Sequence, residues 1–215
     1  MASPRDDYRH QGAPAEVWAF DATDAATGFG VVLRLSFFAA ERVAWWWAGA
    51  VGIGPPLVAL RVADAPLPRR GTTVRTDGLW VAVEPWAVSM ECFGVAYDDP
   101  WEAARSERGD VVPFGLELSF VDAGEPEGLE EGFGQWCTVH GEVLLGDARV
   151  EVDCEGYRAH AWGPGGLPSP FVRVRSAPAS PVSPGNPVAV CPFRLDSGGI
   201  WVETLYPGGW VGRLA

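Results

Sequence analysis

Residues 43–52 carry no charge and no hydrogen-bonding side chain other than three tryptophan indoles. In a β-strand, Trp45 and Trp47 point to one face of the sheet and Trp46 points to the other. Both faces of such a strand need an apolar cover. The uncharged stretch runs on to residue 60, near the length of a membrane span, but glycines and a Pro-Pro pair interrupt it. A strand followed by a turn is therefore the better interpretation.

Apolar and polar residues alternate along most of the chain, which predicts β-strands. The expected strands are residues 16–22, 30–38, 43–52, 57–63, 79–83, 86–97, 114–121, 135–145, 148–155, 157–162, 188–195, 199–206 and 209–214. One short helix is expected near residues 100–107, because Asp98-Asp99-Pro100 is a typical helix start. The acidic stretch 122–132 is expected to be a solvated loop.

The clearest hairpin covers residues 135–155. Gly146-Asp147 fits a two-residue turn with glycine first. If this turn sets the register, Val139 lies opposite Cys154 on an apolar face. His140 then lies opposite Asp153 on the other face, where the pair is expected to be exposed and structural.

These elements predict an all-β barrel or sandwich with one short helix and a C-terminal β appendage. The expected organisation is a disordered lead-in over residues 1–15 and a β domain over residues 16–163. A proline-rich connection over residues 164–187 follows, and residues 188–215 form strands that pack on the barrel or close it.

Composition excludes several classes of function. The net charge of −12 at pH 7 argues against nucleic acid or an anionic membrane surface as a partner. The chain has no lysine, which excludes a Schiff base on its own side chains. The histidines and scattered cysteines show no metal-ligand spacing, and no phosphate-loop, nucleophile-elbow or dinucleotide motif is present. No secretory signal is evident, which predicts a cytoplasmic protein with reduced thiols.

Four motifs resemble those of one protein family. They are residues 44–48 (AWWWA), 90–100 (MECFGVAYDDP, with Gly109 after it), 139–143 (VHGEV) and 156–163 (GYRAHAWG). Together they resemble an uncharacterised actinobacterial group related to the lipocalin-like superfamily of carotenoid 1,2-hydratases (hydroxyneurosporene synthases), tocopherol cyclases and decalin-forming Diels–Alderases. The resemblance extends over residues 16–163. It is most specific in the last motif, which in that group usually reads Arg-Asp-His-Ser-Trp-Gly.

The resemblance implies two lipocalin-like β domains with an apolar pocket for a polyene, prenyl or polyketide substrate. It implies proton-initiated hydration or cyclisation, or a pericyclic closure, without a metal or an organic cofactor. The chain departs from the family in two respects. Ala159 replaces the aspartate of the last motif, so a carboxylate that could orient His160 is missing. About fifty residues follow Gly163, too few for a second full barrel.

Three polar residues are the candidates for catalysis. His160 shares a strand face with Arg158 and would act as a general acid or polarise a substrate carbonyl. Glu91 lies in an apolar strand, where a carboxylate keeps its proton more readily and could protonate an olefin or a carbonyl. Each has a structural alternative. His160 would fix its strand to a neighbour, and Glu91 would face outward or pair with an arginine such as Arg34.

The tryptophans are the candidates for substrate binding. Eleven tryptophans exceed what one core normally uses, so some are expected to line a cavity. Their rings could also stabilise a developing carbocation. The candidates are Trp45, Trp47, Trp80, Trp86 and Trp162, and core packing is the simpler interpretation for most of them.

The sequence thus predicts a cofactor-independent cyclase, pericyclase (Diels–Alderase-like) or hydratase that acts on an apolar polyketide or isoprenoid intermediate. One alternative is a lipocalin-like protein that binds such a molecule without changing it. Another is a single barrel that only pairs with a partner chain or with itself. An exposed edge in the C-terminal hairpin would favour a homodimer. No integral membrane span is expected.

Overall fold

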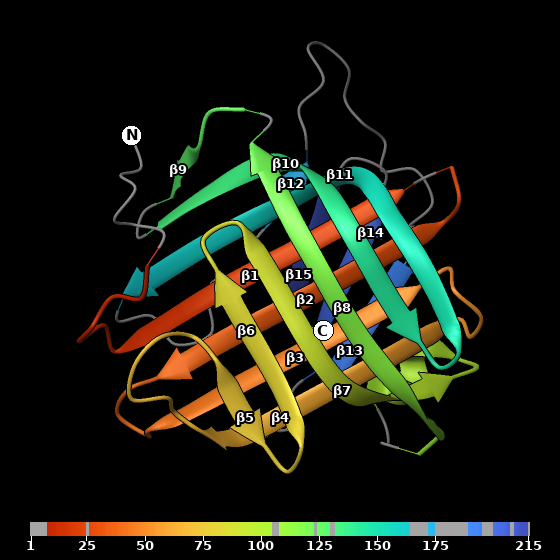
Figure 1. The fold of residues 1–215 in the computed structure, drawn as a ribbon, viewed down its shortest axis with the longest axis horizontal. Helices are drawn as coiled ribbons and strands as arrows, with labels where there is room; N and C mark the ends of the chain where they lie inside the picture. Colours follow the sequence, from red (N-terminus) through yellow and green to blue (C-terminus); the bar gives the residue numbers. More distant parts are fainter. Residues whose placement is uncertain are drawn as a thin grey trace.

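Eight strands close into an antiparallel barrel. The computed structural model describes residues 8–24, 26–104, 108–122, 124–129, 132–163, 172–174, 189–194, 200–206 and 209–214. The barrel strands are β1 (Ala15–Asp24), β2 (Phe29–Phe38), β3 (Val43–Val51), β4 (Leu57–Pro66), β7 (Ala87–Tyr97), β8 (Asp110–Asp122), β10 (Gly132–Leu145) and β11 (Ala148–Gly163). They follow the order β4-β3-β2-β1-β11-β10-β8-β7, and pairing of β4 with β7 closes the ring (Figure 1). The expectation of an all-β barrel or sandwich is confirmed, and the fold is a barrel.

Four shorter elements extend this barrel. They are β5 (Val74–Thr76), β6 (Leu79–Glu84), β9 (Glu127–Leu129) and the 3-10 helix η1 (Pro100–Ala104). β6 and β5 continue the sheet from β7, and β9 pairs with β10, which corrects the expectation of a loop there. η1 lies where a short helix is expected, and residues 105–107 lie outside the described residues. Over the described ranges, no helix is long and apolar enough to span a membrane.

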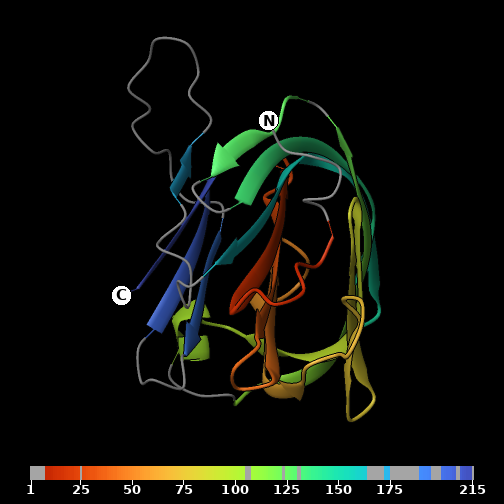
Figure 2. The ribbon, with the colours of Figure 1, turned by 90° about the vertical axis from the view of Figure 1, so that its left-hand side faces the viewer.

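A separate four-stranded sheet lies beside the barrel. Its strands are β12 (Val172–Val174), β13 (Ala189–Arg194), β14 (Ile200–Tyr206) and β15 (Gly209–Leu214). Figure 2 shows this sheet next to β1, β2 and β3, and β13 lies close to β3, β4 and η1. The C-terminal strands therefore pack on the outside of a barrel that β4 and β7 already close.

The tryptophan strand β3 contributes to both sides of the barrel wall. Trp46 lies opposite Leu35 of β2, and its side chain is fully buried in the barrel core. Trp45 and Trp47 point to the outer face. There the guanidinium carbon of Arg34 lies 5.6 Å from the centre of the Trp47 ring. The second sheet lies on this side, so both faces of the strand are covered.

The β10–β11 hairpin has the register that the turn predicts. Val139 pairs with Cys154, and His140 pairs with Asp153. Gly146 has a φ of 59°, as the first position of a type II′ turn requires. The His140 and Asp153 side chains lie 3.1 Å apart and are both exposed, which confirms that this pair faces solvent.

β11 runs without a break through Gly156, where the glycine predicts a strand end. Gly156 lies opposite Ala22 of β1 and Cys137 of β10. A Cβ added at this position would lie 2.3 Å from the carbonyl oxygen of Asp21 and 2.4 Å from Val139 Cγ2. The missing side chain therefore lets three strands approach one another closely.

Replacing Gly156 by alanine is expected to lower the free energy of unfolding by about 1–3 kcal/mol, because the added methyl group must displace the backbone of β1. Urea unfolding followed by tryptophan fluorescence measures the change. Gly124→Ala is the matched control, because a Cβ there meets no atom within 4 Å. Equal stability of the two variants would contradict the close-approach explanation.

Candidate functional site

One end of the barrel brings polar side chains together inside an apolar wall. β1 begins there and β11 ends there, and their pairing puts Glu16 opposite Trp162 and Trp18 opposite His160. Directly opposed residues of antiparallel strands point to the same face of the sheet. Trp18 and Phe20 belong to the barrel core. Glu16 and His160 alternate in phase with these core residues, so their side chains also point inward.

A hydrogen bond joins these two buried side chains. His160 Nε2 lies 2.8 Å from Glu16 Oε1, and each residue is 2 % exposed. Sequence patterns single out His160 but not Glu16. The signal that could have identified Glu16 is a carboxylate in phase with Trp18 and Phe20, since unpaired acidic residues are rarely buried.

The carboxylate that position 159 lacks is supplied by β1. Ala159 points to the outer face of the barrel, where it packs with Ala19 and Tyr157. Neighbouring residues of a strand face opposite sides, so an aspartate at position 159 would point away from the His160 ring in this barrel. Glu16 therefore orients His160 from the paired strand, and the expectation that the histidine lacks a carboxylate partner is wrong.

The segment before β1 contacts the same carboxylate. Residues 8–14, here called the N-terminal strap, belong to the predicted disordered lead-in, of which residues 1–7 lie outside the described chain. The backbone N–H of His10 donates to Glu16 Oε1 at 2.7 Å, and His10 Nδ1 lies 3.1 Å from the same oxygen. The His10 ring stacks on Trp162 with centroids 3.8 Å apart. The strap is thus tied to the end of the barrel through Glu16.

Aromatic rings fix the orientation of His160. Trp18 stacks on the imidazole with centroids 4.6 Å apart and planes inclined by 16°. Phe133 approaches the same ring edge-on at 6.0 Å. Packing on two sides leaves the imidazole little rotational freedom, which keeps Nε2 directed at Glu16.

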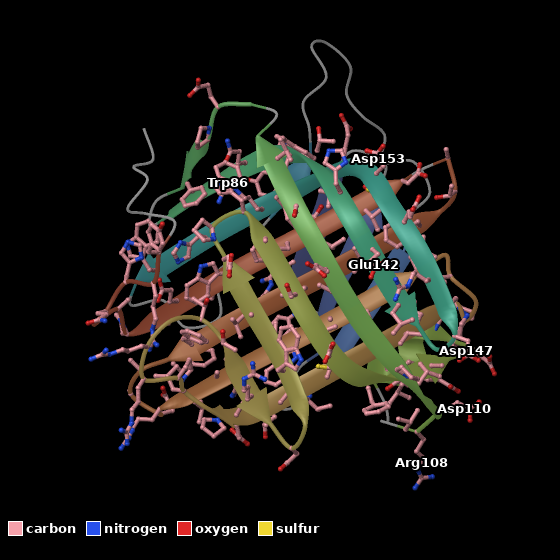
Figure 3. All side chains as sticks on the ribbon, in the orientation of Figure 1. Trp86, Arg108, Asp110, Glu142, Asp147 and Asp153 are labelled. Atoms are coloured by element: carbon pink, nitrogen blue, oxygen red, sulfur yellow. The ribbon has the colours of Figure 1, made fainter. Side chains whose placement is uncertain are left out.

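Arg158 lies next to His160 on the inner face of β11. Its Nε and one terminal nitrogen lie 3.2 and 2.8 Å from Gln135 Oε1, and the other terminal nitrogen donates to the carbonyl oxygen of Pro85. Its guanidinium carbon lies 3.5 Å from the centre of the Trp86 ring. Figure 3 shows Trp86 on the opposite side of the molecule from Asp147, which lies in the β10–β11 turn. Arg158 is therefore held by the turn between β6 and β7.

A hollow of about 210 Å³, partly open to solvent, lies against these side chains. It is lined by Trp18, Phe20, Glu84, Pro85, Phe133, Arg158, Ala159 and His160. Large side chains such as Trp46, Phe114 and Phe120 are less than 2 % exposed and fill the barrel further in. The volume of 210 Å³ includes space that is open to solvent, so the enclosed part of the hollow has room for about one water-sized group.

The remaining sequence candidates lie elsewhere or at the margin of this site. Trp162 contacts His10, and Trp86 contacts Arg158. Glu91 and Trp80 lie together on the outer face of the barrel, where Trp80 Nε1 donates to Glu91 Oε2 at 2.9 Å in an exposed position. The structure brings together His160, Arg158, Trp86 and Trp162, whereas Glu91, Trp80, Trp45 and Trp47 lie on the outer face of the wall.

His10, Glu16 and His160 also offer a donor set that a metal ion could use. Their two nitrogens and one oxygen lie within 4.8 Å of one another. Two histidines and one carboxylate suit divalent transition metals. Both nitrogens approach a single oxygen at 2.8 and 3.1 Å, which are ordinary hydrogen-bond lengths. The observed geometry is thus accounted for by hydrogen bonds within the cluster.

Two cysteines of the barrel wall are poor nucleophiles. Burial raises the pKa of Cys92 to about 11 and that of Cys154 to about 11. At pH 8 the thiolate fraction of each is then on the order of one in a thousand. We expect slow alkylation of both by iodoacetamide in the folded protein and fast alkylation in urea, measured by peptide mass spectrometry. Equal rates in the two conditions would contradict their burial.

Glu16→Leu is expected to lower the free energy of unfolding by roughly 2–4 kcal/mol, because three donors lose their acceptor inside the barrel end. Denaturant unfolding measures the change. Asp153→Asn is the matched control, since it breaks a histidine–carboxylate pair of 3.1 Å whose aspartate side chain is 81 % exposed. The Asp153 variant should be nearly as stable as the parent. A similarly small effect of Glu16→Leu would argue against a structural role for the buried pair.

Comparisons with known proteins identify a family. A family model described as "Domain of unknown function (DUF7064)" matches residues 3–176. No curated protein matches the sequence. Among solved structures, one from Nitrosomonas europaea described as a "putative AttH" aligns with 100 % of this chain and 72 % of its own chain, at 13 % identity and a TM-score of 0.49. That likeness carries no argument about activity. The family match spans most of the sequence, and the chain therefore belongs to the DUF7064 family.

Proposed function

We propose that this protein is a cofactor-independent enzyme that transfers a proton to or from one end of an apolar molecule, in a hydration or a cyclisation. The observation that carries the proposal is the buried hydrogen bond of 2.8 Å between His160 and Glu16, in the wall of a hollow. Buried, hydrogen-bonded pairs of titratable groups at a concave site are typical of general acid–base catalysis.

Glu16 gives His160 a defined role. The carboxylate accepts a hydrogen bond from Nε2–H of His160, which favours the tautomer that carries its proton on Nε2. The other ring nitrogen, Nδ1, is then the atom that exchanges a proton with a ligand. His160 would then protonate an olefin or a carbonyl, or accept a proton from an activated carbon or from water.

Arg158 influences which substrates suit the hollow. Its guanidinium group lines the hollow beside His160, where it can donate to an oxygen atom of a ligand. A positive charge at this position favours a carbonyl or an enolate oxygen over a free carbocation. Trp18 and Phe133 supply the apolar lining. These features support an oxygenated polyketide or isoprenoid end as the reacting group, in a proton-initiated cyclisation or a hydration.

Binding without turnover is the alternative function. The aromatic lining of the hollow favours it, because such a surface holds an apolar group without any proton transfer. In a carrier the His160–Glu16 pair would serve only to hold β1 and β11 together. The two functions therefore differ in whether the ligand exchanges protons with the protein.

Deuterium exchange distinguishes an enzyme from a carrier. The ligand is first identified by native mass spectrometry of the purified protein and is then incubated with the protein in D₂O. We expect protein-dependent deuterium incorporation or conversion, slowed about 10²-fold or more in His160→Gln. His140→Gln is the matched control, because His140 is exposed and paired with Asp153 on the outer face. Binding without incorporation in the parent protein would support the carrier and contradict the enzyme.

A further inference from the structure

We propose that His10, Glu16 and His160 form a proton path between solvent and the hollow, with His10 as its outer end. The proposal rests on the proposed function, because a His160 that exchanges protons with a ligand must return to its starting protonation state, and a path to solvent gives it a route to do so. The proposal gives the N-terminal strap a role in proton transfer, in addition to its contacts with Glu16.

The three side chains form a continuous chain of hydrogen-bond contacts. Glu16 Oε1 lies 2.8 Å from His160 Nε2 and 3.1 Å from His10 Nδ1, so one carboxylate oxygen connects the two imidazoles. Both distances are short enough for proton transfer along a hydrogen bond. His160 reaches the hollow, and Glu16 lies between the two histidines.

Exposure rises along this chain. The His160 and Glu16 side chains are each 3 % exposed, whereas the His10 side chain is 27 % exposed. Trp18 and Phe133 pack against His160 on the inner side. The hollow gives His160 one partly open side, but its Nε2 atom faces the buried Glu16, and His10 is the member of the cluster that meets solvent beyond Glu16.

The outward transfer conserves protons at each step. His160 as imidazolium gives its Nε2 proton to Glu16, which becomes a neutral carboxylic acid, and His160 is left as the neutral Nδ1–H tautomer. Glu16 passes that proton to Nδ1 of a His10 tautomer protonated at Nε2. The resulting His10 imidazolium releases its Nε2 proton to water and returns to its first tautomer by exchange with solvent. His160 regains the Nε2–H tautomer when a proton returns to Nε2 along the path and the Nδ1 proton leaves through the hollow. Inward transfer follows the same steps in reverse.

The strap has features that hold His10 in this position. Arg9 donates to the carbonyl oxygens of Pro68 and Gly71 at 2.6 and 3.2 Å, next to His10 in the chain. The N–H of Ala13 donates to the His10 carbonyl oxygen at 3.2 Å and closes a turn. The His10 ring is fixed by its stacking on Trp162. Other charged groups near the path are Arg9 on the strap, Arg158 on β11 and Glu84 at the hollow.

Nuclear magnetic resonance can measure the path without any substrate. The chain has three histidines, so ¹⁵N-histidine labelling gives three ring systems, which single variants assign. The solvent-exchange rate of the His160 Nε2 proton is expected to fall about tenfold in His10→Gln, which keeps a donor for Glu16 but cannot relay a proton. His140→Gln should leave that rate unchanged.

Chemical rescue separates a relay from a structural role. His10→Ala leaves a space between Trp162 and Glu16, and added imidazole is expected to restore the exchange rate of His160 in that variant. Unchanged or faster exchange in His10→Gln, or no response of His10→Ala to imidazole, would overturn the proposal. A rate that changes when EDTA is added to the parent protein would also overturn it, in favour of a metal site. The deuterium assay on the ligand tests the proposed function separately, so the two can fail independently.

Discussion

Closure of the barrel depends on a short pairing between β4 and β7, in which Leu57 lies opposite Tyr97 and Ala59 lies opposite Val95. Once the ring is closed, every strand has an inner and an outer face, and alternation assigns each side chain to one of them. A shift of β11 by one residue would turn His160 outward and bring its neighbours inward. The candidate site is therefore a property of strand register as well as of residue type.

Strand positions and the β10–β11 register could be predicted because the turn at Gly146 and the alternation of side chains act locally. The facing of β3 could not be predicted in the same way. The second sheet makes the outer side of this wall apolar as well, so alternation no longer distinguishes inside from outside. On β7, by contrast, alternation does assign Glu91 to a face. Its apolar neighbours Met90 and Cys92 face the core, whereas Glu91 itself faces outward.

The sequence predicts some residues of the candidate site but not Glu16 or His10. The motif around His160 identifies the histidine, Arg158 and Trp162. Its acidic partner is 144 residues away in the chain, and only the pairing of β1 with β11 brings the two together. His10 is harder still to recognise, because the strap has no regular structure and its position depends on contacts with Glu16 and Trp162. The replacement at Ala159 is misleading for a geometric reason, since that position faces the other side of the wall.

The packing of Trp46 links the barrel to its capacity for ligands. Trp46 lies on β3, which pairs with β2 and β4. Its indole is fully buried and fills space inside this part of the barrel. Over the described residues, the barrel core around Trp46 is therefore packed with side chains rather than hollow. In a related chain with a small residue at this position, the same backbone would enclose an internal chamber. A single amino-acid substitution could then change the size of the ligand that the barrel accepts, without any change of topology.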